Sequence, residues 1–404
     1  MKLFNKNYLL MVFGNSISSI GDLFYTSAIA YWVYNKTNST TLVAFLSSIT
    51  LVILAVGGPF TGMLADKSKK KKTIILMDLF RGILMLLFGI IGVLGQINIT
   101  YIVITSILMA IFSVIYKPFS NLAFLSYIPR DDIVRGQSIS SIVMTASSVG
   151  GKAVSGILIG IFGVPIAIII NGISFILVSL SECFLKEVYP RKATQDKEHI
   201  SRLQLFNDGC KMIIKNKEIA FITKIYVLMV LGMIGINAIL ITFVINAGYS
   251  IEQYGYLLSF LSLAGVLSAI LLSIKKISIK TQLKLIIIGL LLGMIFYIIG
   301  FNTKGFILLT LFLSFGELFF GVGFSILDAI FVIIIPEENR GLTLGFISTI
   351  CTLASIISNM LYGFLSELIG IKTTFITIPS IFIILFMILI LTNFYEIKKI
   401  SNKN

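Results

Sequence analysis

The chain has 404 residues, of which 57% are hydrophobic and only 12% are charged. Soluble domains carry about 25% charged residues, and a globular core cannot enclose so much apolar surface, because polar residues must still cover its outside. These proportions exclude an ordinary water-soluble enzyme or binding domain and indicate a protein that is solvated by lipid.

Twelve apolar runs follow one another along the chain. About 20 residues are needed to cross a hydrocarbon layer of about 30 Å, and backbone groups in lipid must be hydrogen-bonded within their own segment. We therefore predict an all-α membrane protein with twelve transmembrane helices. The predicted spans are 8–34, 42–62, 73–95, 99–117, 137–161, 164–185, 219–246, 253–274, 283–301, 305–332, 342–365 and 372–394.

The basic residues are unevenly distributed between the predicted loops. If the N-terminus lies in the cytoplasm, twelve crossings place 26 of the 32 Lys and Arg residues on the cytoplasmic side, as the positive-inside rule requires. We expect a multi-pass protein of the inner (plasma) membrane with both termini in the cytoplasm. Anionic membrane lipid accounts for the net charge of +14, so no nucleic-acid partner is expected.

The two ends of the chain resemble each other. Gly156 and Gly163 recur as Gly363 and Gly370 at an offset of 207 residues. Such duplication is typical of transporters whose substrate site lies between two halves near the membrane midplane. We predict two pseudo-symmetric six-helix halves with a charged linker, namely an N-terminal half at 1–185, a cytoplasmic linker at 186–218 and a C-terminal half at 219–404.

Asp22 interrupts the first apolar run near its middle, where a charged side chain costs about 2.5 to 3.5 kcal/mol. It belongs to a polar stripe with spacings of three and four residues, which faces protein or water rather than lipid. Two interpretations stay open, a proton or substrate site in a central cavity and a hydrogen-bond partner for a neighbouring helix. The stripe consists of Asn15, Ser18, Ser19, Asp22, Tyr25 and Thr26.

Glu317 lies in the middle of the tenth run, with Ser314 on the same face. A carboxyl removed from water binds a proton more readily, because its charged form loses hydration. Asp22 and Glu317 are therefore the candidates for proton coupling.

Lys152 lies near the centre of the fifth run, too deep to reach either membrane surface easily. It can pair with an acid, of which Asp22 is one, or bind an anionic group of a substrate. Asn359 is its counterpart in the second half. We count Lys152 and Asn359 as candidates for the substrate cavity, together with Asn237 and Ser314.

Several motifs resemble the major facilitator superfamily. The segment after the second run, Gly62-Met63-Leu64-Ala65-Asp66-Lys67 followed by a lysine cluster, is similar to the signature between helices 2 and 3 of that family. Three further segments resemble the branch with macrolide efflux proteins and siderophore exporters, namely Gly21-Asp22, Asp78-Leu79-Phe80-Arg81 and the Pro-Glu-Glu-Asn-Arg-Gly sequence at 336–341. The resemblance implies alternating access and a cytoplasmic latch, for which the candidates are Gly62, Asp66, Lys67, Lys70, Asp78 and Arg81.

Three functions are compatible with these features. The first is a proton-coupled antiporter for efflux of a lipophilic drug such as a macrolide, which would confer antibiotic resistance. The second is export of an endogenous anionic metabolite or siderophore, and the third is a transport-inactive membrane sensor or scaffold. The chain has no phosphate-binding glycine loop and no catalytic constellation, so we expect no enzyme activity, no cofactor and no metal site. The expected partners are a small-molecule substrate, protons and membrane lipid, and we expect a monomer.

Overall fold

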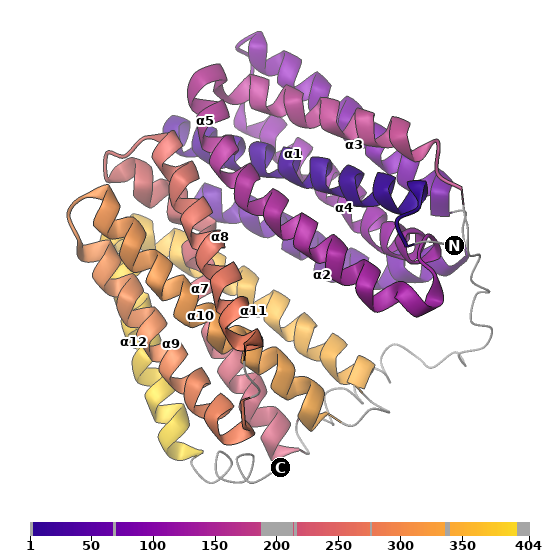
Figure 1. The fold of residues 1–404 in the computed structure, drawn as a ribbon. Helices are drawn as coiled ribbons and strands as arrows, with labels where there is room; N and C mark the ends of the chain where they lie inside the picture. The colour runs from indigo at the N-terminus through magenta and orange to yellow at the C-terminus, as the bar shows by residue number, and fades with distance from the viewer. Residues whose placement is uncertain are drawn as a thin grey trace. The chain divides into compact units, whose positions relative to one another are not determined.

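The computed structural model describes residues 3–67, 70–186, 213, 216–274, 277–335 and 340–393. Within these ranges the protein consists of eleven α-helices and one short 3-10 helix, and it contains no strand (Figure 1). The elements are α1 (Lys6–Thr37), α2 (Thr40–Lys67), α3 (Lys70–Val93), α4 (Ile99–Ser126), η1 (Arg130–Asp132), α5 (Ile133–Glu182), α7 (Lys217–Asn246), α8 (Ile251–Ser273), α9 (Ile279–Asn302), α10 (Phe306–Ile334), α11 (Arg340–Ile369) and α12 (Ile371–Thr392).

The helix α5 contains the fifth and sixth predicted spans. Gly163 interrupts its helical geometry with φ 81° and ψ 170°, a conformation that glycine adopts without a steric penalty. The chain reverses direction there, because Gly151 packs against Leu23 of α1 while Asn171 packs against Gly21, only two residues away. Counted as two segments, α5 raises the eleven described α-helices to twelve helical segments, so the prediction of twelve membrane crossings is confirmed in part.

The predicted end of the fourth span at residue 117 was wrong, because α4 continues to Ser126 with Pro118 inside it. Proline removes one backbone donor, which neighbouring helices and polar side chains compensate in membrane proteins. Phe119 and Ala123, beyond the proline, are buried in one cluster with Met11 of α1. This burial against a distant part of the chain holds the last turns in the helix, and hydropathy alone does not reveal it.

The chain divides into two compact units. Unit 1 comprises residues 1–196 and 244–259, and unit 2 comprises residues 197–243 and 260–404. The division into two halves and a linker at 186–218 stays a prediction, since most of that linker lies outside the described residues.

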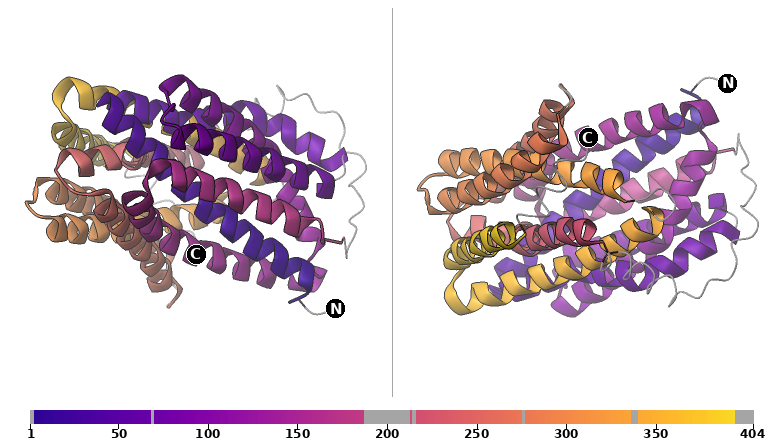
Figure 2. Two further views of the ribbon diagram at one scale, coloured as in Figure 1. Left: turned by 90° about the horizontal axis from the view of Figure 1, so that it is seen from above. Right: turned by 90° about the horizontal axis from the view of Figure 1, so that it is seen from below.

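In unit 1, α5 packs along both α1 and α3 (Figure 2). Glycines bring α3 and α5 to backbone distance. A Cβ atom on Gly82 would lie 3.0 Å from the carbonyl oxygen of Gly172, and one on Gly89 would lie 3.1 Å from the amide nitrogen of Ile169. Small residues drive helix association in lipid in this way, since no hydrophobic force brings helices together there.

In unit 2, α7 and α11 meet at a similar close contact. The Ser358 hydroxyl accepts a hydrogen bond from the backbone N–H of Gly235 at 2.9 Å and donates to the carbonyl oxygen of Leu231 at 2.8 Å. The Tyr362 hydroxyl donates to the carbonyl oxygen of Gly232. These bonds tie two helices together inside the apolar layer, where an unpaired polar group is costly.

The repeated glycines adopt similar conformations. Gly163 has φ 81° and Gly370, before α12, has φ 88°. Both lie between consecutive apolar segments that need a tight reversal. The repeat detected in the sequence therefore has a structural counterpart in each unit.

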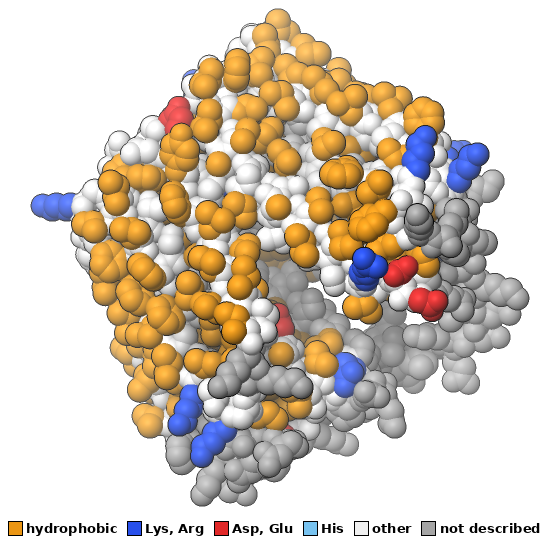
Figure 3. All heavy atoms as spheres, in the orientation of Figure 1, with side chains coloured by type: hydrophobic (Ala, Val, Ile, Leu, Met, Phe, Trp, Pro, Cys, Tyr) orange, Lys and Arg blue, Asp and Glu red, His pale blue; other side chains and the backbone are white. Residues whose placement is uncertain are grey.

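The outer surface is suited to lipid. Apolar side chains cover much of the face shown in Figure 3, where Lys and Arg are few. Ten of the described helices are long and apolar enough to cross a membrane, and α1, which carries the polar stripe, is not among them. Large apolar side chains such as Leu391 and Phe184 are 70% and 68% exposed, an exposure that water would disfavour and lipid accommodates.

We predict that Gly235→Ala destabilises unit 2 by about 1–3 kcal/mol, because the new Cβ overpacks a closed interface. It would lie 2.6 Å from the carbonyl oxygen of Ser358. The measurement is the free energy of unfolding of the purified protein in detergent. The control is Gly345→Ala on α11, where nothing lies within 4 Å of the added atom. Equal stability of the two variants would contradict the packing argument.

Candidate functional site

A cavity of about 770 Å³ opens in unit 1 between α1, α3, α4 and α5. Most of the residues that line it have polar or charged side chains, although each contributing helix is predominantly apolar. Four residues of the predicted stripe on α1 line it, including Asp22. The lining residues are Asn15, Ser18, Ser19, Asp22, Arg81, Ser113, Tyr116, Lys117, Ser120, Asn121, Phe124, Leu125, Gln137, Ser140, Ser141 and Met144.

Asp22 forms an ion pair with Arg81 on the wall of this cavity. The Oδ2 atom of Asp22 lies 3.4 Å from the Nη2 atom of Arg81. The Asp22 side chain is 42% exposed, whereas that of Arg81 is 5% exposed. Gly21, the preceding residue, lets α1 approach α5 here, since a Cβ atom on it would lie 2.4 Å from the Oδ1 atom of Asn171.

Arg81 also binds a second carboxylate. Its Nη1 atom donates to the Oδ1 atom of Asp78 at 2.8 Å, and the Asp78 side chain is fully buried. The guanidinium stacks on the ring of Phe175 at 3.9 Å and lies 5.1 Å from the ring of Tyr116. An arginine fits this position because its planar, weakly hydrated fork can serve two acceptors and two rings at once.

A third carboxyl reaches this region from the end of α5. Glu182 is 2% exposed, and its Oε1 atom lies 3.3 Å from the Tyr116 hydroxyl. The same hydroxyl donates to the Oδ1 atom of Asn15 at 2.9 Å. Tyr116 and Glu182 were not among the site residues predicted from the sequence. Glu182 could have been found as an acid within the sixth apolar run. Tyr116 could have been found from the polar residues around it at three- and four-residue spacing, but the predicted span 99–117 ended directly after it.

The latch candidates lie in different environments. Asp78 and Arg81 were expected at the cytoplasmic end of the third span, but they lie more than two turns inside α3, which begins at Lys70. Asp78 pairs with Arg81, and Arg81 also pairs with Asp22, because buried charges must be neutralised locally. The surroundings of Gly62 and the side chains of Asp66 and Lys67 are not among the features that the structure describes, and Lys70 is half-buried. The latch stays a prediction.

The other unit 1 candidates lie outside the lining of this cavity. The Tyr25 hydroxyl is 3.1 Å from the Oγ atom of Ser106, and the Thr26 hydroxyl donates to the backbone carbonyl oxygen of Asp22 at 2.9 Å. Lys152 is half-buried in the first segment of α5. Its proposed pairing with Asp22 stays a prediction.

In unit 2, the Tyr297 hydroxyl of α9 donates to the Oε2 atom of Glu317 at 2.7 Å. Tyr297 is 2% exposed, so this bond connects α9 and α10 in the interior. Ser314 is half-buried on the same helix as Glu317, Asn237 on α7 is exposed, and Asn359 on α11 is buried.

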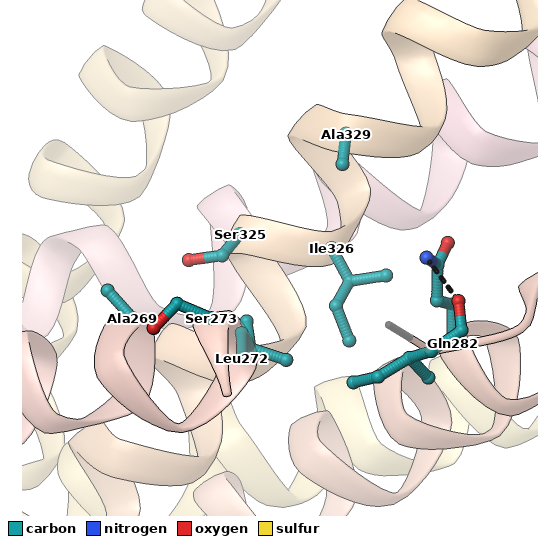
Figure 4. Close-up of a pocket in the computed structure, with 8 residues that line it drawn as sticks. Ala269, Leu272, Ser273, Gln282, Ser325, Ile326 and Ala329 are labelled. Carbon is teal, nitrogen blue, oxygen red and sulfur yellow. Dashed lines mark hydrogen bonds between the residues drawn. The ribbon is translucent and has the colours of Figure 1, made fainter. Parts of the chain in front are cut away.

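A second cavity, of about 630 Å³, lies within unit 2 between α8, α9 and α10 (Figure 4). Ser325 and Ile326 of α10 face it, and the Gln282 amide donates to the carbonyl oxygen of Ile277 at 3.0 Å on its α9 side. None of the described residues that line it is charged. Of the two cavities, the one in unit 1 therefore has charged residues in its described lining.

We predict that Arg81→Met lowers the free energy of unfolding by about 3–5 kcal/mol, because removal of one partner leaves a buried carboxylate uncompensated. Arg81→Met with Asp78→Leu should regain most of this loss, since an apolar pair needs no neutralisation. The measurement is unfolding of the purified protein in detergent. The control is Lys36→Met, at an exposed position at the end of α1. A double variant as unstable as the single one would contradict this account.

The sequence profile of the Major Facilitator Superfamily matches residues 11–357. The chain is 24% identical over 397 residues to the "Uncharacterized MFS-type transporter YfiS" of Bacillus subtilis (strain 168), covering 95% of this chain and 92% of that protein. It is 20% identical over 228 residues to macrolide efflux protein A of Streptococcus pyogenes, covering 56% of each.

A solved structure shares the fold. A bacterial homologue of the human lysosomal transporter Spinster, in an inward-facing and unoccupied conformation, superposes with a TM-score of 0.77 at 14% identity, covering 97% of both chains. Together with the profile match over most of the sequence, this likeness accounts for the apolar helices and the internal repeat. The chain belongs to the Major Facilitator Superfamily and is a multi-pass membrane transporter rather than an enzyme.

Proposed function

We propose that this transporter exports a lipophilic compound, such as a macrolide, in exchange for protons and by alternating access. The observation that carries the proposal is the half-exposed carboxylate of Asp22, paired with Arg81 on the wall of a large cavity. The likeness to macrolide efflux protein A supports the substrate class. We further propose that both termini lie in the cytoplasm, which the distribution of basic residues supports.

The ion pair offers a physical route for coupling. Asp22 can exchange a proton with cavity water because part of its side chain is exposed, whereas Asp78 on the other side of Arg81 is fully buried. A proton on Asp22 removes its ionic attraction to Arg81 and leaves the guanidinium to Asp78. The contact between α1 and α3 is then weaker, and a ligand or proton that alters such a contact differently in two states shifts the equilibrium between them.

The wall chemistry suits an amphipathic substrate. Phe124, Leu125 and Met144 supply apolar surface, and serine, asparagine and glutamine side chains supply hydrogen bonds. Ligand sites for such compounds combine an apolar surface with a few polar groups that fix orientation. Glu317, hydrogen-bonded to Tyr297, is proposed as a second proton-binding carboxyl in unit 2.

A specific observation favours a second candidate, export of an anionic metabolite. Arg81 and Lys117 line the cavity against a single lining carboxylate, Asp22. Asp22 and Asp78 neutralise Arg81, so Lys117 is the group on this wall that can contact an anion. If Lys117→Gln and Lys152→Ala each leave export of every anionic compound in a metabolite panel unchanged, this candidate fails.

We predict that a pH gradient drives efflux of at least one lipophilic drug from everted membrane vesicles. Asp22→Asn and Glu317→Gln should each reduce this transport to the level seen without a gradient, because neither amide can bind and release a proton. The matched control is Asp131→Asn, an exposed acid in η1, which should transport normally. Gradient-independent transport that both variants leave unchanged would refute proton coupling at these residues.

A further inference from the structure

We propose that Glu182 is a proton-holding acid one hydrogen bond behind the wall of the unit 1 cavity, and that Tyr116 connects it to the cavity. Tyr116 and Asn15 line the cavity, whereas Glu182 is not among the lining residues. This inference rests on the proposed function only in that the proton on Glu182 takes part in coupling export to proton uptake. The geometry itself requires no substrate.

The single hydrogen of the Tyr116 hydroxyl cannot serve both of its contacts, which favours a protonated Glu182. The Tyr116 hydroxyl has one hydrogen and two close acceptors, the Oδ1 atom of Asn15 at 2.9 Å and the Oε1 atom of Glu182 at 3.3 Å. If the hydrogen points to the nearer acceptor, the contact with Glu182 has no hydrogen unless the carboxyl supplies one. A protonated Glu182 donates to the Tyr116 oxygen, and Tyr116 donates to Asn15, so each of the two contacts of the Tyr116 hydroxyl contains one hydrogen.

The charges around Arg81 also favour a protonated Glu182. Asp78 and Asp22 already share its single positive charge, at 2.8 Å and 3.4 Å. Glu182 makes no ion pair with any basic group in the described part of the chain. Its Oε2 atom is buried without a hydrogen-bond partner. A third anion here would be an uncompensated buried charge, which is strongly unfavourable.

Glu182 lies at the C-terminal end of a helix, where a negative charge is disfavoured. It is the last residue of α5, where the free carbonyl groups of the final turn place partial negative charge. Lys71 of α3 offsets part of that charge, but its amine donates to the carbonyl oxygen of Cys183 at 2.7 Å rather than to the carboxyl. The helix terminus therefore also favours the neutral acid.

Three helices place titratable or charged groups near Glu182. The helix α3 contributes Asp78, Arg81 and Lys71, and α4 contributes Tyr116. From α1, Asn15 contacts Tyr116, while Asp22 contacts Arg81. Arg81 and Lys71 are thus engaged by other acceptors, and Glu182 is in no ion pair with a described basic residue, which leaves the proton as its neutralising charge.

The test is infrared difference spectroscopy of purified protein in detergent between acidic and alkaline pH, without substrate or gradient. The wild-type spectrum should contain the carbonyl stretch of a protonated, buried carboxyl, and Glu182→Gln should lose that component. The matched control Asp131→Asn should keep it. An unchanged spectrum for Glu182→Gln would overturn the proposal.

Two further measurements use the same samples. Glu182→Gln should melt at the wild-type temperature, because the amide donates to Tyr116 as the neutral acid does, and a marked loss of melting temperature would show that an anion is needed and overturn the proposal. Tyr116→Phe should keep the carboxyl band but delay its shift on transfer to deuterated water. An undelayed shift would refute the connecting role of Tyr116.

These outcomes are separate from those of the proposed function. If the band depends on Glu182 but efflux ignores the pH gradient, the proton site stands and proton-driven export falls. If efflux follows the gradient but the band is independent of Glu182, export stands and this assignment falls.

Discussion

The arrangement of unit 1 depends on one buried guanidinium. Arg81 lies on α3, binds Asp22 of α1, and packs against Tyr116 of α4 and Phe175 of α5. A charge in an apolar layer must be neutralised and hydrogen-bonded where it lies, so these four helices can pack only in the register that brings those groups together. Because Arg81 is removed from water, the need to neutralise its charge outweighs any one apolar contact.

Close helix packing is what permits such a polar cluster within lipid. Gly21, Gly82 and Gly172 remove the side chains that would hold α1 and α3 away from α5. The helices then exclude water from Asp78 while leaving Asp22 partly exposed to the cavity. Two carboxylates on one arginine thus have different environments, one suited to holding the arginine and the other to proton exchange.

The two units carry different chemistry although they share an architecture. In unit 1, Asp22 and Asp78 pair with one arginine and Glu182 contacts Tyr116 beside it, whereas Glu317 in unit 2 is bonded to Tyr297 and the described lining of the unit 2 cavity is uncharged. Duplication preserved the glycine reversals at Gly163 and Gly370, which the backbone requires. The charged groups described in the two units differ.

The sequence alone determined the membrane class, the all-helical fold, the order of the apolar segments and the polar stripe containing Asp22, because hydropathy and helical period are local properties of a chain. The tertiary structure decided which groups meet. The pairing of Asp22 with Arg81, 59 residues away, the extension of α4 beyond Pro118 and the contact of Tyr116 with Glu182 all depend on how helices lie against one another. Each results from the burial of polar groups between helices, and that burial does not exist until the helices have packed.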